Sequence, residues 1–517
     1  MKNYLAIDIG GTWLKAALYD GTELSATVRV PSRLDTGDVE NAVFEAASQL
    51  GAESIAGIGV STAGIVDYAG TKVARSAGHL TPLCRTAWKD AVERKFNAPC
   101  VLINDADAAM IAAHRLELVG PGDNCALIAV GTGLGCSVIR GSHRIRPARM
   151  LALAGSVRLP DGASYDSIAS AVRLGAGRDL AQLFHDNPPE LEKYLDDLAC
   201  VVKTVCILYK LDAAVITGGL AAAAASGGFD LRLALSSRTA EPVPELGTPI
   251  RIEVSAKGLP LIGAGLLAEA IAFQGVKLPP NPDSTTERSL FGDLELTDLD
   301  SCELARRFSE AECAAGERFA ASLPALALAA DRAAANFARG GRLIYIGAGT
   351  SGRLGAVDAV ELPCTYGIEP HRAVALIAGG NDDAALTIES DGEEDASSVP
   401  ELLLLNLDER DTVIGVSASG GAFFVTSGLN YAKFRGAFTV LIQESPEART
   451  TVDALIPLRS GAEAVAGSTR MKAGTATKKA LNFLSTIVMI KLGFTRKSRM
   501  INMQTLNEKL RLRAARM

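Results

Sequence analysis

The sequence predicts an α/β protein in which two domains of parallel sheet and helix are followed by a helical tail. Apolar runs that end in glycine-rich turns recur along the chain, at residues 5–12, 126–133, 213–219, 342–352 and 412–420. Stretches of helical composition lie between these runs, and that alternation is typical of parallel sheets covered by helices. The segment 278–286 carries three prolines and several polar turn formers, so we expect an exposed linker there.

Length and composition describe a globular protein. At about 100 to 200 residues per domain, 517 residues correspond to about three or four compact units. Hydrophobic residues make up 48% and charged residues 21% of the chain, which argues against disorder, and the net charge of -7 argues against a nucleic-acid partner. Nine cysteines without a C-x-x-C pair argue against a disulfide framework or a zinc ribbon. With no leader-like start and no long apolar segment, we expect a cytoplasmic protein with no membrane partner.

Three glycine turns in the first half predict one divided nucleotide site. Residues 5–18 and 126–139 each have the pattern of strand, glycine turn, strand, whereas residues 213–219 end a strand in two glycines before an Ala-rich helix. A phosphotransferase needs backbone N–H groups around the phosphates, a carboxylate for the metal ion and a base for the attacking hydroxyl. Asp8 is the candidate for the metal, and the phosphate and nucleotide candidates are Gly10, Gly11, Thr12, Gly131, Thr132, Gly133, Gly218 and Gly219.

The candidate base is Asp105. It follows the apolar run 101–104 and precedes an Ala-rich stretch, so it is expected where a strand ends and a helix begins. A carboxylate at that place can be held near a bound hydroxyl. Local sequence favours equally the alternative that Asp105 or Asp107 is the N-cap of the helix.

With these residues, segment 1–275 resembles the ROK family of sugar kinases, which has a two-lobed actin-like ATPase fold. Asp8 to Thr12 and Gly131 to Gly135 are similar to its two phosphate motifs, and Asn104-Asp105 to its catalytic motif. The resemblance implies a kinase domain over residues 1–276 that uses ATP and Mg²⁺ to phosphorylate a hexose or an amino sugar. The family's Cys-rich zinc segment and Glu-x-x-Gly-His sugar clamp are missing, and residues 153–158 stand where the clamp is expected.

Polar glycine loops in the second half predict a sugar phosphate site. Hydroxyls and free N–H groups at a helix start suit a phosphate monoester, and no Walker lysine follows the first loop. The loops are residues 347–353, 417–420 and 467–472. Two carboxylates are candidate acid–base groups, Glu361 and Glu394. The alternative interpretation is that Glu394 lies in a solvated acidic loop and that Glu361, near the helix-ending Pro363, faces solvent.

Residues 284–517 resemble the N-acetylmuramic acid 6-phosphate etherases, which have the SIS fold, a parallel α/β sandwich. The segments that carry the resemblance are 286–288, 341–367, 378–380, 416–420, 463–486 and 507–511. The resemblance implies an etherase domain over residues 287–517 after a linker at 277–286, with Glu361 and Glu394 as catalytic groups and Glu393 as the alternate for the second. It implies no cofactor for this domain. The residues expected to contact the phosphate of the substrate are Thr350, Ser351, Gly352, Arg353, Ser417, Ser419 and Ser468.

One departure concerns the second loop of this domain. The sequence has Gly420-Gly421-Ala422 where the family has Gly-Arg-Thr. A polar contact to the substrate is therefore either lost or supplied by Arg353.

The chemistry of such an etherase agrees with two carboxylates. In the ring-opened sugar phosphate, the C2 proton lies next to the C1 aldehyde and the lactyl ether oxygen on C3 is a β leaving group. We expect Glu361 to serve the elimination and Glu394 the later addition of water. The products are N-acetylglucosamine 6-phosphate and D-lactate.

Taken together, the two halves predict a bifunctional salvage enzyme that acts on amino sugars and their phosphates. The kinase half makes a 6-phosphate and the etherase half consumes one. Two alternatives remain: a degenerate sugar-sensing kinase half joined to a working etherase, or a non-catalytic regulator that binds sugar phosphates, similar to the mammalian glucokinase regulator. SIS enzymes commonly share their sites across a two-fold axis, so we expect a homodimer through the C-terminal half.

Overall fold

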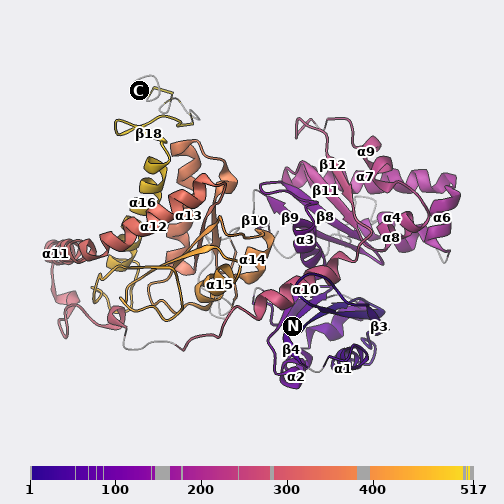
Figure 1. Cartoon of the computed structure of the whole chain (residues 1–517), viewed down its shortest axis with the longest axis horizontal. Helices are drawn as coiled ribbons and strands as arrows, with labels where there is room; N and C mark the ends of the chain where they lie inside the picture. The colour runs from indigo at the N-terminus through magenta and orange to yellow at the C-terminus, as the bar shows by residue number, and fades with distance from the viewer. Residues whose placement is uncertain are drawn as a thin grey trace. The chain divides into compact units, whose positions relative to one another are not determined.

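The computed structural model describes most of the chain as two compact units, which are considered separately (Figure 1). The first unit is built from Met1–Ala272 and Leu403–Asn406, and the second from Phe273–Leu402 and Leu407–Met517. The residues that the structure describes are 3–52, 54–67, 69–76, 78–85, 87–140, 143–145, 164–175, 178–242, 244–279, 284–380, 396–504, 508 and 511–512.

The first unit contains two five-stranded sheets with the same winding. The first sheet has the order β3-β2-β1-β4-β7 and the second has the order β10-β9-β8-β11-β12. In the first sheet, β1 and β2 are antiparallel, and β4 and β7 are parallel to β1. In the second sheet, β8 and β9 are antiparallel, and β11 and β12 are parallel to β8. The strands are β1 (Asn3–Ile9), β2 (Trp13–Tyr19), β3 (Val28–Pro31), β4 (Ile55–Thr62), β7 (Cys100–Asn104), β8 (Cys125–Val130), β9 (Leu134–Arg140), β10 (His143–Ile145), β11 (Ala213–Thr217) and β12 (Arg251–Val254), with a small pair β5 (Ile65–Val66) and β6 (Val73–Arg75).

Helices cover these sheets and enclose an apolar core around each. They are α1 (Val39–Gln49), α2 (Ala87–Phe96), α3 (Asp105–Arg115), α4 (Tyr165–Ala169), α5 (Ala171–Gly175), α6 (Leu180–Asp186), α7 (Pro189–Tyr209), α8 (Gly219–Ser226), α9 (Leu231–Arg238) and α10 (Leu259–Ile271), with the 3-10 helix η1 (Gly78–Cys84).

Helix α10 packs with its backbone directly against neighbouring backbone. A Cβ at Gly59 of β4 would lie 2.0 Å from the carbonyl oxygen of Ala264, and a Cβ at Gly263 would lie 1.9 Å from that of Ala108 in α3. Only glycine fits such contacts. The glycines therefore fix how closely α10 approaches the sheet and α3.

The second unit is a parallel sheet between two helical layers. Its strand order is β14-β13-β15-β16-β17, and every neighbouring pair is parallel. Helices α12, α13 and α16 share one apolar core with the sheet, whereas Gly428 of α15 and Leu402 of α14 meet at Ile346 on the other face (Figure 1). The elements are α11 (Ser301–Phe319), α12 (Leu323–Ala338), β13 (Leu343–Gly347), α13 (Gly349–Tyr366), β14 (Ala373–Ile377), α14 (Val399–Leu404), β15 (Thr412–Val416), α15 (Phe423–Phe434), β16 (Phe438–Gln443), β17 (Ala454–Pro457), α16 (Lys472–Lys491), β18 (Thr495–Arg496) and β19 (Arg499–Met500), with short 3-10 helices η3 (Thr285–Glu287), η4 (Leu296–Asp298), η5 (Ala320–Ser322) and η6 (Pro370–Arg372).

The segment before the predicted linker packs against α15 of this unit. The rings of Phe273 and Phe434 stack with their centroids 3.6 Å apart. The side-chain amide of Asn430 donates to the carbonyl oxygen of Gln274 at 3.0 Å. Arg449 also donates to the carbonyl oxygen of Pro279, within the predicted linker, so residues 273–279 belong to the packing of the second unit.

Two local expectations differ from the structure. The predicted helical tail is interrupted after Lys491, because Gly493 takes a φ of 81° and a hairpin of β18 and β19 follows. Pro363 does not end its helix. It lies inside α13, which continues to Tyr366 and stops at Gly367, where φ is 71°.

Candidate nucleotide and sugar phosphate sites

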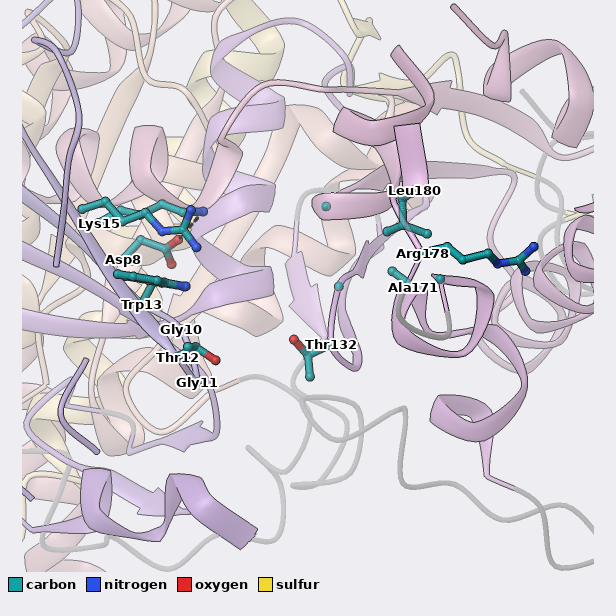
Figure 2. Close-up of a pocket in the computed structure, with 14 residues that line it drawn as sticks. Asp8, Gly10, Gly11, Thr12, Trp13, Lys15, Thr132, Ala171, Arg178 and Leu180 are labelled. Carbon is teal, nitrogen blue, oxygen red and sulfur yellow. Dashed lines mark ion pairs between the residues drawn. The ribbon is translucent and has the colours of Figure 1, made fainter. Parts of the chain in front are cut away.

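Two strand-to-strand turns of the first unit open onto one cavity of about 530 Å³. In Figure 2, Asp8, Gly10 to Trp13 and Lys15 lie on one side, Ala171, Arg178 and Leu180 on the other, and Thr132 between them. The volume falls within the range of small-molecule sites, about 300 to 1,000 Å³. The predicted residues that line it are Asp8, Gly10, Gly11, Thr12, Gly131, Thr132 and Gly219.

Two neighbours hold the side chain of Asp8, which lines this cavity. It lies near the end of β1, where Ser61 of β4 donates to its carboxylate at 3.0 Å and the ammonium of Lys15 lies 3.8 Å away. Burial raises the pKa of Asp8, while Lys15 and the Ser61 hydroxyl act in the opposite direction. The carboxylate is thus ordered and partly neutralised before any cation binds.

Asp105 is the first residue of α3 and does not cap it. The N-cap is Asn104, whose side-chain oxygen accepts from the backbone N–H groups of Ala106 and Asp107. Asp107 is occupied elsewhere, because its carboxylate accepts from Ser137 at 2.7 Å. The N-cap alternative is therefore wrong for both aspartates.

The carboxylate of Asp105 faces the second glycine turn. A Cβ built at Gly135 would lie 3.6 Å from its Oδ1. Burial, and then the charge of Asp8, raises the pKa of Asp105 to about 7. That is the range in which a carboxylate accepts a proton efficiently near neutral pH.

The third turn meets the second at the strand ends. Gly218 has a φ of 96°, and a Cβ there would lie 2.7 Å from the carbonyl oxygen of Val130, so no other residue fits. Gly219 begins α8 and has open space beside it. Gly133 closes the second turn by accepting the N–H of Gly131 at 2.9 Å. Residues 153–158, expected at the sugar clamp, lie outside the described residues.

The first predicted phosphate loop of the second unit leads from β13 into α13. Thr350 and Ser351 lie in the first turn of the helix, where no side chain caps the N–H groups. Gly352 has a different role: it packs on Gly347, and a Cβ there would meet that carbonyl oxygen at 2.7 Å. Arg353 follows, partly buried, in the same turn. Uncapped N–H groups and hydroxyls at a helix start favour an anion.

The second loop follows β15 at the same edge of the sheet, because β13 and β15 pair in parallel from Leu343 to Gly347. The hydroxyls of Ser417 and Ser419 lie 3.5 Å apart, and Ser417 accepts the N–H of Gly420 at 3.1 Å. Gly420 has a φ of 68°, and a Cβ there would lie 2.0 Å from Oε1 of Gln443, so the turn requires glycine. Thr350, Ser351, Ser417 and Ser419 thus share one edge of the sheet.

Ser468 belongs to a separate loop before α16. Its N–H donates to Val465, and the neighbouring Gly467 donates to the carbonyl oxygen of Thr286 at 2.9 Å. Among the described residues, no hydrogen bond joins Ser468 to Ser417 or Ser351.

Glu361 lies exposed on α13, paired with a lysine. The Nζ of Lys478 in α16 lies 3.2 Å from a Glu361 oxygen, and 62% of the Glu361 side chain is accessible. Asp358, one turn earlier, is buried and accepts from Tyr345 at 2.7 Å and from Ser485 at 3.2 Å. Burial raises the pKa of Asp358. The second carboxylate, Glu394, and its alternate Glu393 lie outside the described residues.

Comparisons with known proteins agree with this division into two halves. Residues 4–157 match the model of the ROK family, and residues 325–433 match that of the glucokinase regulatory protein N-terminal SIS domain. An N-acetylmuramic acid 6-phosphate etherase of Salmonella agona is 44% identical over 229 residues, which are 43% of this chain and 76% of the relative. Through its C-terminal part, the chain belongs to the N-acetylmuramic acid 6-phosphate etherase family.

A second etherase, from Caldanaerobacter subterraneus subsp. tengcongensis, is 47% identical over 197 residues. The match covers 38% of this chain and 64% of that relative, slightly less than two thirds of its length. A solved ROK family glucokinase from Streptomyces griseus, in complex with glucose and AMPPNP, is 20% identical, with a TM-score of 0.43, over 52% of this chain and 99% of its own. The predicted combination of a ROK domain with an SIS etherase domain is confirmed.

Within the etherase domain, Glu361 is far from the phosphate loops of its own chain. Glu361 lies ten positions after Ser351 on α13. At a rise of about 1.5 Å per residue, that spacing corresponds to about 15 Å along the helix axis. The structure therefore brings Thr350, Ser351, Ser417 and Ser419 to one edge of the sheet, but it brings neither Ser468 nor the predicted acid–base group Glu361 to them.

Two charged residues of the etherase domain were missed by sequence reasoning. The first is Lys478, whose ammonium lies between the carboxylates of Glu361 and Asp358. The sequence indicates only that Asp358 precedes Glu361 by three residues, which places both on the same face of a helix. Glu463 is fully buried and caps α16 by accepting from the N–H of Ala473 at 2.9 Å. Nothing local distinguishes these residues from surface charges.

Among the residues that the structure describes, every helix is too short or too polar to span a membrane. In the same residues, no group of three or more His, Cys, Asp or Glu side chains is arranged to hold a metal ion.

Proposed function

We propose that the chain is a bifunctional enzyme that phosphorylates N-acetylmuramic acid, or a related amino sugar, and then cleaves the lactyl ether of the 6-phosphate. The observation that carries the proposal is the etherase-family segment that holds Glu361 and two hydroxyl-rich loops at one edge of a parallel sheet. The cavity around Asp8 in the ROK domain supports the kinase step.

In the etherase step, the loops hold the phosphate of the ring-opened sugar. Thr350, Ser351, Ser417 and Ser419 donate hydroxyl hydrogen bonds, and the start of α13 adds backbone donors. Glu361 removes the C2 proton, the C3–O bond to lactate breaks as the double bond between C2 and C3 forms, and the leaving oxygen takes up a proton to become the hydroxyl of lactate. Glu394 then takes a proton from water as the water oxygen bonds to C3, and a proton returns to C2. The products are N-acetylglucosamine 6-phosphate and D-lactate.

In the kinase step, the residues fit a nucleotide and one cation. Asp8 presents a carboxylate to Mg²⁺, which takes one or two protein carboxylates together with substrate phosphates. Bound Mg-ATP would supply the phosphoryl group and the charge neutralisation. The turns at Gly10 and Gly131 offer backbone N–H groups to its phosphates, and Asp105 takes the proton from the sugar hydroxyl.

The spacing along α13 supports an assembly of two copies. A phosphate on C6 and the proton on C2 of one hexose are only a few bonds apart, whereas Ser351 and Glu361 are about 15 Å apart along one helix. We propose that a homodimer through the C-terminal unit joins the loops of one copy to Glu361 of the other.

A second function is favoured by the match of residues 325–433 to a regulatory SIS domain. On that interpretation the chain binds sugar phosphates without chemistry. It predicts binding of N-acetylmuramic acid 6-phosphate without release of lactate.

The test uses the full chain with N-acetylmuramic acid and Mg-ATP, and follows ADP and D-lactate together. We expect both products from the wild type, neither from Asp105→Ala, and only ADP from Glu361→Ala. Release of lactate from supplied 6-phosphate, without ADP formation from the free sugar, would leave a working etherase beside a sensor. No lactate from either substrate would exclude the etherase.

A further inference from the structure

The second phosphate loop, residues 417–421, has a glycine at position 421, and Arg449 from another loop lies next to that glycine. Gly421 follows the serine pair, and a Cβ built there would lie 3.0 Å from Nη1 of Arg449 and 3.9 Å from the Ser419 hydroxyl. The guanidinium and the hydroxyl therefore flank the same small space. Gly421 donates its N–H to Ser419 at 3.3 Å, which keeps the loop tightly turned beneath them.

The sheet explains why these two loops meet. Strands β15 and β16 are parallel neighbours, so the chain after Val416 and the chain after Gln443 leave the same edge. The N–H of Ser417 donates to Ile442 at 3.0 Å, and that of Glu444 donates to Ala418 at 3.2 Å. Arg449 lies in the loop after β16 and reaches back over the loop after β15.

Arg449 is fixed at one end of its guanidinium. Its Nη2 donates to the carbonyl oxygen of Pro279 at 2.7 Å, and the side chain is partly buried. Within the described residues, no carboxylate lies within ion-pair distance of this guanidinium, whereas many other arginines, such as Arg342 with Asp411, have one. A half-anchored guanidinium that has no counter-ion among the described residues, and that flanks the same space as the Ser419 hydroxyl, is suited to an anion.

We propose that Arg449 is a phosphate-binding residue of the etherase site and supplies the cation that the bare Gly420-Gly421 turn cannot. The proposal rests on the proposed function, since the anion it names is the 6-phosphate of the amino sugar. Nη1 points to the space above Gly421, and Nη2 stays on Pro279. Ser417, Ser419 and Arg449 then form one phosphate cradle. The two hydroxyls donate hydrogen bonds to the phosphate, and the arginine donates a further, charge-assisted hydrogen bond to it.

The experiment compares Arg449→Ala, Arg449→Lys and the control Arg410→Ala in the full chain. Arg410 is a matched exposed arginine that pairs with Asp408 just before β15, at the opposite end of that strand. With N-acetylmuramic acid 6-phosphate as substrate, Arg449→Ala should raise KM about 10- to 100-fold, as expected for loss of a charge-assisted hydrogen bond, and change kcat much less. Arg449→Lys should fall between it and the wild type, and Arg410→Ala should match the wild type.

A second variant separates phosphate binding from a purely structural role. Gly421→Arg in the Arg449→Ala background places a guanidinium on the other side of the same space, which the truncation has vacated. Recovery of KM by at least tenfold relative to Arg449→Ala would support the cradle. An unchanged KM in Arg449→Ala, or a loss that Gly421→Arg does not reverse, would overturn it.

A binding measurement keeps this test independent of turnover. Calorimetric titration with N-acetylglucosamine 6-phosphate should show a weaker Kd in Arg449→Ala than in Arg410→Ala. If the wild type releases no lactate, the proposed etherase function fails. If, in addition, Arg449→Ala and Arg410→Ala bind the sugar phosphate with equal Kd, the role of Arg449 is also rejected. Weaker binding in Arg449→Ala would sustain the cradle without the chemistry.

Discussion

Two inactive variants, mixed in one dimer, should restore release of lactate. The first is Glu361→Ala, which removes the proposed base. The second is Ser351→Asp, which places a carboxylate in the first turn of α13, where it repels the substrate phosphate. Each homodimer should be inactive, because each carries the same defect in both of its sites.

The expected recovery follows from the helix and from two-fold symmetry. Ser351 and Glu361 lie ten residues apart on α13, about 15 Å along its axis at about 1.5 Å per residue. If each site combines the loops of one copy with Glu361 of the other, a heterodimer has one site with both defects and one with none. It should therefore retain about half of the wild-type activity per dimer.

The assay isolates heterodimers with two different affinity tags after co-expression and measures D-lactate from N-acetylmuramic acid 6-phosphate. Heterodimers of wild type with Glu361→Ala provide the reference for one intact site. Heterodimers of the two variants that are no more active than either homodimer would refute the shared site. So would a wild-type chain that is active as a monomer.

Three further predictions concern other residues. Because burial and Asp8 raise the pKa of Asp105 to about 7, kcat/KM for phosphorylation should rise about tenfold per pH unit below pH 7 and level off above it, and a flat pH profile would contradict the assignment. The variant Asp105→Asn should abolish ADP formation. It should also raise Tm at pH 8, because the wild type holds a buried charge at that pH. Lys478→Met should lower kcat for lactate release with little change in KM, because the Nζ of Lys478 lies 3.2 Å from Glu361 and positions its carboxylate. The control is the neighbouring variant Lys479→Met, which leaves this pair intact. An equal kcat in the two variants would reject the role of Lys478. Gly263→Val should cost the first unit about 1 to 3 kcal/mol of unfolding free energy in chemical denaturation, since its Cβ would lie 1.9 Å from the Ala108 carbonyl oxygen, whereas Gly258→Ala, with nothing within 4 Å, should cost much less.

The sequence was most informative where a motif is local. The turns at Gly10, Gly131 and Gly218 were predictable because an apolar strand followed by glycine specifies its own geometry within a few residues. The start of α13 was predictable for the same reason. The cavity then followed from two turns of the same pattern in two sheets that wind alike.

Other parts of the sites depend on contacts between distant residues. The pairing of Lys478 with Glu361 spans 117 positions, and no local pattern indicates which lysine of α16 faces α13. Asn104 was overlooked as the cap because the two aspartates after it are equally good cap formers by type. Arg449 reached its place only because β15 and β16 are neighbours in the sheet.

The packing of residues 273–279 determines where the two halves can be separated without damage. The stack of Phe273 on Phe434 and the bond from Arg449 to Pro279 make this short stretch part of the etherase half, although its last two residues lie in the proline-rich segment 278–286. A protease cut or a gene boundary placed after Pro279 would leave those partners on the wrong fragment. A cut just before Phe273 would keep them, so an etherase transplanted alone into another protein needs this stretch as its own first residues.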